Sequence, residues 1–447
     1  MNVIDLVSQN SNLLSWQQGL QKNNRELILG LSATTKAIVM ASVFDSIEKA
    51  VLITSSYNEA ERLASDFIAL LGEEKVHTFL GDDNPLAEFV FASQERQFAR
   101  LEALNFLCQE DRQGLLVTNV SGIKLLLPSP KVFTSSIFKL KVVQEIDLTT
   151  LSETLQKIGY QKVSQVLQQG EFSLRGDILD IFEIEQLQPY RIEFFGDEID
   201  RISEIDVLTG EIKCQLAHIG IFPASHYVVP AEQIQKAAIA IEEELKERVD
   251  YFKSEDKLLE AQRISERTNF DIEMMKETGF CSGIENYSRH LSGLEPGQPP
   301  YTLLDYFGDD FLLIIDESHK TVPQVGAMYA GDQNRKQTLV DYGFRLPSAK
   351  DNRPLSFEEF ENKLDQVLFV SATPGDYEYD HELLRAEQII RPTGLLDPKV
   401  EVRPVEGQID DLISEITKET SRKNKVLITT LTKRMAEDLT QYMKDVG

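Results

Sequence analysis

Two adjacent carboxylates at the end of a buried strand are the residues best placed to do chemistry. Residues 311–319 read Phe-Leu-Leu-Ile-Ile-Asp-Glu-Ser-His, so five apolar residues predict a short strand that ends at Asp316 and Glu317. In an open parallel sheet, ligands bind at the carboxyl ends of the strands. Asp316 is placed to hold Mg²⁺, directly or through water, and Glu317 to orient a water that attacks a γ-phosphate. The alternative is a strand that runs into an acidic turn.

A candidate phosphate loop precedes the first expected helix, but it departs from the working pattern. Residues 30–37 read Gly-Leu-Ser-Ala-Thr-Thr-Lys-Ala, whereas a P-loop reads G-x-x-x-x-G-K-[ST]. Gly30 and Lys36 are in place, but Thr35 stands at the second glycine and Ala37 at the hydroxyl that binds Mg²⁺. A Cβ at position 35 obstructs the backbone cradle for phosphates. The pattern therefore predicts a loop that has lost nucleotide binding.

A second candidate site lies on a β-rich stretch. Because side chains alternate along a strand, Arg191, Glu193 and Phe195 of the segment Tyr-Arg-Ile-Glu-Phe-Phe share one face. If the neighbouring strands pair, Arg175 joins them. An arginine and an aromatic side chain on an exposed face are typical of a binding hot spot. The alternative is a solvated sheet face with one stray aromatic side chain.

Length, charge and cysteine content limit the possible classes of protein. The 447 residues allow about three domains. The net charge of −27 repels a phosphate backbone, so any DNA contact must come from a local groove, and a basic protein is an equally good partner. Cys108, Cys214 and Cys281 have no metal-ligand spacing and indicate a reducing cytoplasm. No apolar run approaches the ~20 residues of a membrane span, and no signal peptide is visible.

The elements that must position these residues follow from periodicity. Strands are expected at 26–29, 50–54, 115–118, 311–315 and 367–370, and helices at 58–71 and 86–107. Residues 229–278 predict helix, because one apolar stripe recurs every three or four positions. A further strand is expected at 425–429. Alternation of strands and helices indicates a parallel sheet.

A second motif connects the acidic pair to a known family. Ser371-Ala372-Thr373 follows the strand at 367–370, and DESH followed by SAT resembles motifs II and III of superfamily 2 helicases. From about residue 200 the chain is similar to the UvrB family, which verifies damage in bacterial nucleotide excision repair. The matching segments are 202–211, 221–226, 279–290, 342–349 and 389–398. The resemblance implies ATP and Mg²⁺ as cofactors of the parent family. Asp316 and Glu317 then stand at the metal and catalytic positions, and Gly30, Lys36, Ser371 and Thr373 at vestigial nucleotide positions.

The first part of the chain resembles a different family. Residues 1 to about 200, with matching segments at 30–37, 160–167 and 170–182, are similar to the N-terminal region of Mfd, the transcription-repair coupling factor. In both families the β-rich module binds UvrA, and Arg175, Arg191 and Phe195 match the contact positions. The Mfd resemblance also implies lost ATPase motifs, a link to RNA polymerase and no damage-probing hairpin at 78–113. Together the two resemblances predict a chimera.

These resemblances imply an α/β fold with a RecA-like domain, an inserted β-rich UvrA-binding module and a second, incomplete RecA-like domain. The expected divisions are 1–125 (first part of the RecA-like domain), 126–215 (β-rich module), 216–319 (helical segment and return to the sheet), 320–355 (DNA-facing subdomain), 356–394 (end of the RecA-like domain) and 395–447 (start of the second domain, with motifs V and VI expected beyond Gly447). The expected function is a cytoplasmic repair protein that binds UvrA with its motor inactive or impaired, with weak or no DNA binding through Arg335 and Lys336. The alternative is a residual ATP-dependent DNA-repair enzyme.

Overall fold

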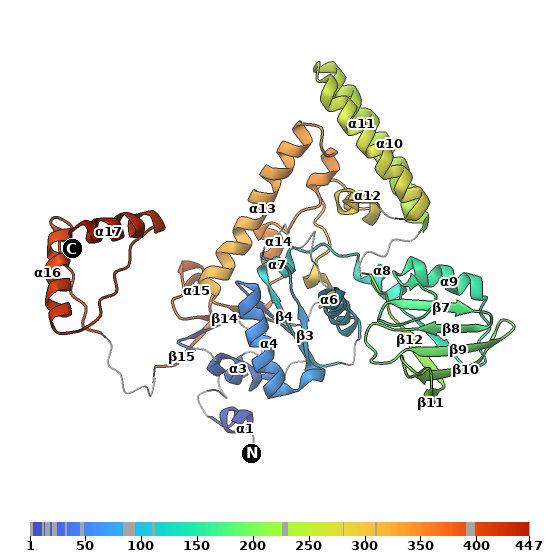
Figure 1. Cartoon of the computed structure of the whole chain (residues 1–447), viewed down its shortest axis with the longest axis horizontal. Coiled ribbons are helices and arrows are strands. Elements are labelled where there is room, and N and C mark those ends of the chain that lie inside the picture. Colours follow the sequence, from blue (N-terminus) through green and yellow to red (C-terminus); the bar gives the residue numbers. More distant parts are fainter. Residues whose placement is uncertain are drawn as a thin grey trace. The chain divides into compact units, whose positions relative to one another are not determined.

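A parallel sheet of seven strands lies in the larger of two units of the computed structural model of the chain (Figure 1). The two units are Met1–Ile389 and Ile390–Gly447. The structure describes residues 3–446, except for 11–12, 14–17, 20–24, 32–33, 45–48, 84–93, 110–111, 226–230, 280, 309–310 and 390–397. The expected α/β fold with a parallel sheet is confirmed in the first unit.

Every pair of neighbouring strands in this sheet runs parallel. In pairing order the strands are β15 (Leu384–Glu387), β1 (Arg25–Leu29), β14 (Gln366–Ser371), β13 (Leu312–Asp316), β2 (Lys49–Thr54), β4 (Gly114–Asn119) and β3 (Val76–Phe79). The five strands expected from the sequence in this unit are therefore confirmed to within one residue at each end. Because β14 lies between β1 and β13, the altered phosphate loop, Ser371 and the acidic pair all leave the sheet at its carboxyl edge.

Side chains of the central strands alternate between two apolar cores, one on each face of the sheet. In β2, Val51 and Ile53 belong to one core, and Ala50 and Leu52 belong to the other. The long helices that complete the cores are α6 (Gln94–Leu107) and α13 (Ser318–Asp341) on one face, and α3 (Thr34–Ala41) and α4 (Tyr57–Leu71) on the other. Burial on both faces explains why these strands are almost continuously apolar.

The β-rich module forms a separate sheet of six strands with its own core. In pairing order the strands are β11 (Ile212–Leu216), β10 (Glu198–Ile205), β9 (Tyr190–Phe195), β8 (Ile178–Ile181), β7 (Glu171–Arg175) and β6 (Gln161–Lys162). One face packs on helix α9 (Leu148–Lys157), and the pair β5 (Phe138–Lys141) and β12 (His218–Ile221) completes the core. The other face of β7–β9 carries the polar side chains that the alternation predicts.

Two long helices, α10 (Ala231–Ser254) and α11 (Leu258–Thr278), form an antiparallel hairpin beside α12 (Ser288–Ser292) (Figure 1). The apolar stripe predicted for residues 229–278 is confirmed, because Ala238, Ile241, Leu245 and Phe252 are buried in the core of this hairpin. The stripe is thus structural, and the charged residues of the other faces are solvated.

Shorter elements connect these parts. They are α1 (Val3–Ser8), η2 (Glu73–Lys75), α7 (Val120–Ile123), α8 (Pro130–Ser135), η3 (Ile284–Tyr287), η4 (Leu303–Tyr306), η5 (Pro347–Lys350), α14 (Phe357–Glu361) and α15 (Asp376–His381). The helix expected at 86–107 is confirmed from Gln94 onward, and its earlier part lies outside the described residues. Residues 84–93 and 110–111 of the segment 78–113, which was expected to lack a hairpin, also lie outside them. In the described part of the chain, no helix is both long and apolar enough to cross a membrane.

The second unit contains α16 (Gln408–Ser421) and α17 (Lys433–Val446), and no strand among its described residues. The strand predicted at 425–429 is therefore wrong. Its apolar residues Val426, Leu427 and Ile428 are exposed. A strand needs a neighbour to satisfy its backbone N–H and C=O groups, and the described part of this unit supplies none. The segment that the sequence suggests as a linker, 391–395, lies outside the described residues.

Candidate functional site

Lys36 and the acidic pair meet at the carboxyl edge of the parallel sheet. Lys36 Nζ lies 2.8 Å from Asp316 Oδ1 and 2.5 Å from Glu317 Oε1. The lysine stands in the first turns of α3, and the two acids stand where β13 passes into α13. The sheet therefore brings together three residues that the sequence singled out, although Lys36 and Asp316 are 280 positions apart.

The loop before Lys36 keeps one feature of a phosphate loop and lacks another. Gly30 follows β1 with φ of +78°, and a Cβ there would lie 2.6 Å from the carbonyl oxygen of Gln388, so this position requires glycine. Ala37, at the expected hydroxyl position, is fully buried in the apolar core under α3. Ser32 and Ala33, in the middle of the loop, lie outside the described residues. Position 37 thus contributes to packing and offers no metal ligand.

Burial and charge act against each other at this cluster. Burial alone would lower the pKa of the Lys36 ammonium, but Asp316 and Glu317 together raise it above its ordinary value. Burial raises the pKa of the Asp316 carboxyl, and Lys36 offsets this only in part. Asp316 Oδ2 is buried and has no hydrogen-bond partner among the described residues. That oxygen is the atom of the cluster best suited to accept a metal ion or a water.

Glu317 occupies a strained backbone conformation beside a second polar pair. Its φ of 43° and ψ of 51° are left-handed, which is uncommon for a residue with a side chain. His319 Nδ1 lies 2.8 Å from Ser371 Oγ and 3.5 Å from Glu317 Oε2. Ser371 Oγ also accepts a hydrogen bond of 3.1 Å from the backbone N–H of Thr373. The acidic motif and the SAT motif are therefore in direct contact.

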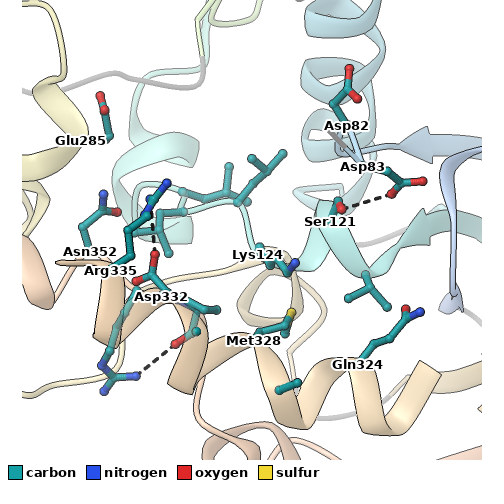
Figure 2. A pocket seen from close by; sticks show the side chains of 18 of the residues that line it. Asp82, Asp83, Ser121, Lys124, Glu285, Gln324, Met328, Asp332, Arg335 and Asn352 are labelled. Atoms are coloured by element: carbon teal, nitrogen blue, oxygen red, sulfur yellow. Dashed lines mark hydrogen bonds and ion pairs between the residues drawn. The ribbon is translucent and has the colours of Figure 1, made fainter. Parts of the chain in front are cut away.

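A cavity of about 760 Å³ opens beyond the carboxyl ends of β2, β4 and β3 and reaches along α13 (Figure 2). Arg335 and Lys336, the candidate DNA contacts, line it, but both form ion pairs with Asp332, at 3.6 Å and 2.8 Å. Five cationic and four anionic side chains line the cavity in all, so its charges nearly cancel. Lys124, which forms no ion pair among the described residues, is a cation here that the sequence did not single out.

The exposed face of the β-rich module holds the other candidate site. Arg175 on β7, Arg191 on β9 and Phe195 at the end of β9 lie on the face opposite to α9. Phe195 is 85% exposed, whereas Phe194 beside it in the strand faces the core. The structure therefore places all three residues on one surface, as the alternation predicts.

One residue of this face was missed by the sequence reasoning. Asp180, on the strand between β7 and β9, accepts hydrogen bonds from both arginines. An acid at an outward position of the strand between two arginine-bearing strands was the available signal. It could be used only once the order β7-β8-β9 was known.

Family models match two parts of the chain. The UvrB interaction domain matches residues 138–227, which include the β-rich sheet and its exposed arginines. The UvrB third helical domain matches residues 232–293, which include most of the α10–α11 hairpin and α12. Both modules therefore resemble parts of one family.

Relatives with the same name match nearly the whole chain. UvrABC system protein B of Agathobacter rectalis is 54% identical over 446 residues, which cover 96% of this chain and 67% of that relative. The proteins of that name from Caldicellulosiruptor bescii and Bacillus licheniformis are 46% and 47% identical, over 96% and 94% of this chain. The chain spans about two thirds of the length of these relatives.

These matches confirm the UvrB resemblance and give no support to an Mfd-like origin of residues 1–200. A single relative accounts for 96% of the chain, so no junction between two families is needed. The Mfd resemblance rested on three short segments, 30–37, 160–167 and 170–182, whereas the match to the UvrB relative is continuous over nearly the whole chain. Only the Mfd resemblance implied a link to RNA polymerase, so that link has no support either. The chain belongs to the UvrB family.

Proposed function

We propose that this chain acts in nucleotide excision repair by binding UvrA through its β-rich module. The proposal rests on one observation. The residues that match the UvrB interaction domain present Arg175, Arg191 and Phe195 on a single exposed sheet face. The relatives are named as components of a UvrABC system, which makes UvrA the natural partner.

The physical chemistry of the face suits a protein partner. Phe195 contributes little to the module's own core because it is 85% exposed. Burial of a phenylalanine side chain against a partner gains about 1.5–3 kcal/mol. Aromatic and arginine side chains dominate binding hot spots, because they combine apolar area with directional hydrogen bonds. An exposed phenylalanine on a surface that contacts only water would gain none of this burial energy.

The test is the affinity of UvrA for the full chain and for an Arg191→Ala, Phe195→Ala double variant, measured by titration calorimetry. Truncation of a hot-spot residue costs about 2 kcal/mol or more, which is ~30-fold in affinity, so the loss of both should weaken binding by roughly 10³-fold if the two effects add. The matched control is Lys157→Ala, Leu187→Ala, which removes one exposed cation on α9 and a side chain that is 87% exposed. The control should bind like the parent, and a parent chain that does not bind UvrA refutes the proposal.

We also propose that ATP hydrolysis by this chain is impaired. When bound, Mg²⁺ neutralises phosphate charge in enzymes of this class. Asp316, with its unpartnered buried oxygen, fits that ion, whereas Ala37 supplies no hydroxyl for it. Lys36, which would contact the phosphates, is engaged by both acids at 2.8 Å and 2.5 Å. The acidic half of the site thus suits a nucleotide better than the loop half does.

A residual ATP-dependent DNA-repair enzyme is the second candidate, because Lys36, Asp316 and Glu317 are assembled at the sheet edge. Release of phosphate from ATP with Mg²⁺ separates the two readings. We expect no release above background for the parent, and the same for Glu317→Gln. Steady release that Glu317→Gln abolishes would establish the second candidate. The near-neutral lining around Arg335 and Lys336 favours weak or no DNA binding in either case.

A further inference from the structure

We infer that Asp180 is a positioning residue for the docking of UvrA, because it holds the guanidinium groups of Arg175 and Arg191 side by side on the exposed face. The inference rests on the proposed function and goes beyond it, since it names the residue that organises the docking surface. It also defines the chemistry that the partner must offer.

The contacts of Asp180 define a two-arginine clamp. Its Oδ1 accepts a hydrogen bond of 2.7 Å from Arg191 Nε, and its Oδ2 accepts one of 2.9 Å from Arg191 Nη2. The same Oδ2 accepts a third hydrogen bond, of 2.6 Å, from Arg175 Nη2. Bidentate pairing of arginine with a carboxylate is strong and fixes the plane of the guanidinium group. One carboxylate therefore sets the orientation of both arginines.

The strand register explains why position 180 can do this. Strand β8 lies between β7 and β9, and Asp180 stands directly opposite Arg191 on β9 and Ser173 on β7. Arg175 is two residues further along β7, which places it diagonally across from Asp180 on the same face. Diagonal neighbours in a sheet are within reach of long side chains. Asp180 is the only acid of β8, the strand between the two arginine-bearing strands, among the described residues.

The three side chains differ in exposure in a way that suits positioning. The Asp180 side chain is 4% exposed, whereas those of Arg191 and Arg175 are 23% and 54% exposed. Hydrogen bonding to Asp180 is the main reason why the pKa of Arg191 lies above its ordinary value. The buried acid thus faces the arginines, and the arginines face outward. Their remaining N–H groups form no hydrogen bond with the described residues and are available to a partner.

Prior ordering of these side chains should strengthen binding. A free arginine samples many rotamers and loses that freedom when a partner fixes it. A side chain already held in its bound arrangement avoids part of this loss. The partner surface that fits is one with acidic side chains, which would accept from the free N–H groups, beside an apolar recess for Phe195.

Removing the charge of Asp180 and removing its hold on the arginines should change the affinity for UvrA in opposite directions. This difference makes the inference testable. Replacement by the isosteric Asp180→Asn makes the face more positive by one unit. If charge alone mattered, an acidic partner would then bind more tightly. If positioning matters, binding should weaken, because the amide cannot hold both guanidinium groups.

The experiment measures the affinity of UvrA for four proteins. They are the full chain, the Asp180→Asn variant, the double variant Arg175→Ala, Arg191→Ala, and the triple variant that combines these changes. We expect Asp180→Asn to weaken binding about ten-fold in the parent and to have almost no effect when both arginines are absent. Such non-additivity is the signature of a residue that acts through the arginines. The matched control is Glu153→Gln on α9, which removes one exposed carboxylate from the other side of the module.

The outcomes distinguish a failure of the inference from a failure of the proposed function. Unchanged or tighter binding by Asp180→Asn overturns the inference and leaves the proposed docking intact. Equal losses with and without the arginines also overturn it, because they indicate a general defect of the module. A parent chain that does not bind UvrA overturns both the proposed function and the inference.

Discussion

Lys36 and Glu183 are buried ionisable residues, and only Lys36 has partners that keep it charged. Lys36 has two carboxylate partners within 2.8 Å, which keep its ammonium charged. Glu183 is 1% exposed, and its Oε1 has no hydrogen-bond partner among the described residues. Burial raises the pKa of Glu183 to about 8, although the backbone N–H of Glu185 partly opposes this. Below about pH 8 the β-rich module therefore holds Glu183 in its protonated, neutral form.

The pH dependence of stability should reveal this residue. The folded-state pKa of Glu183 is about 8 and the ordinary value is 4.5, so between these pH values the folded chain holds a proton that the unfolded chain has released. The free energy of unfolding should therefore fall as pH rises through this window, by up to about 1.4 kcal/mol per pH unit. Urea unfolding at pH 5 and pH 8 measures the fall.

The Glu183→Gln variant should lose most of this dependence and be more stable than the parent at pH 8. The control is Glu198→Gln, which removes an exposed carboxylate at the start of β10. An unchanged pH slope in Glu183→Gln would show that other groups cause it.

At the scale of elements, the α10–α11 hairpin is held to the end of α13 by a few directed contacts. Arg248 on α10 donates a 3.0 Å hydrogen bond to the carbonyl of Val340 and stacks over the ring of Phe252. Gly343, with φ of +69°, lies so close to α11 that a Cβ would be 2.6 Å from the carbonyl oxygen of Glu260. Helix α13 thus carries the acidic motif at one end and supports the hairpin at the other.

Phe252 should be the residue on which the hairpin most depends. It is fully buried, and replacement of a buried phenylalanine by alanine typically costs about 3–5 kcal/mol. Phe252→Ala should therefore lower the free energy of unfolding by several kcal/mol in a denaturant titration. Leu259→Ala, at a position that is 72% exposed in the next helix, should change it by less than about 0.5 kcal/mol. Similar losses in the two variants would mean that the hairpin has no packed core of its own.

At the scale of the whole molecule, the sequence predicted those features that depend on local periodicity. The strands of the parallel sheet, the helical stripe and the outward face of β9 all follow from alternation or a 3.6-residue repeat. The strand at 425–429 was predicted wrongly, since an apolar run becomes a strand only when another strand pairs with it. The contacts of Asp180 and the place of Lys124 in the cavity could not be found from sequence, because both depend on which segments become neighbours.

Short segments and the whole chain point to different families. The altered loop at 30–37 and the segments 160–167 and 170–182 are short, and they suggested a second family for residues 1–200. The match over 96% of the chain is global and gives no support to that division. Loss of a few motif residues is therefore compatible with membership of the UvrB family, and it is informative about activity instead.

The central claim is that this chain docks UvrA through the β-rich module without any need for its nucleotide site. Titration of UvrA into the nucleotide-free chain, repeated with Lys36→Ala, tests it most directly. We expect saturable binding with the same affinity for both, because Lys36 lies at the edge of the parallel sheet and not on the exposed face of β7–β9. Absence of binding by the nucleotide-free parent, or its loss in Lys36→Ala, would contradict the account.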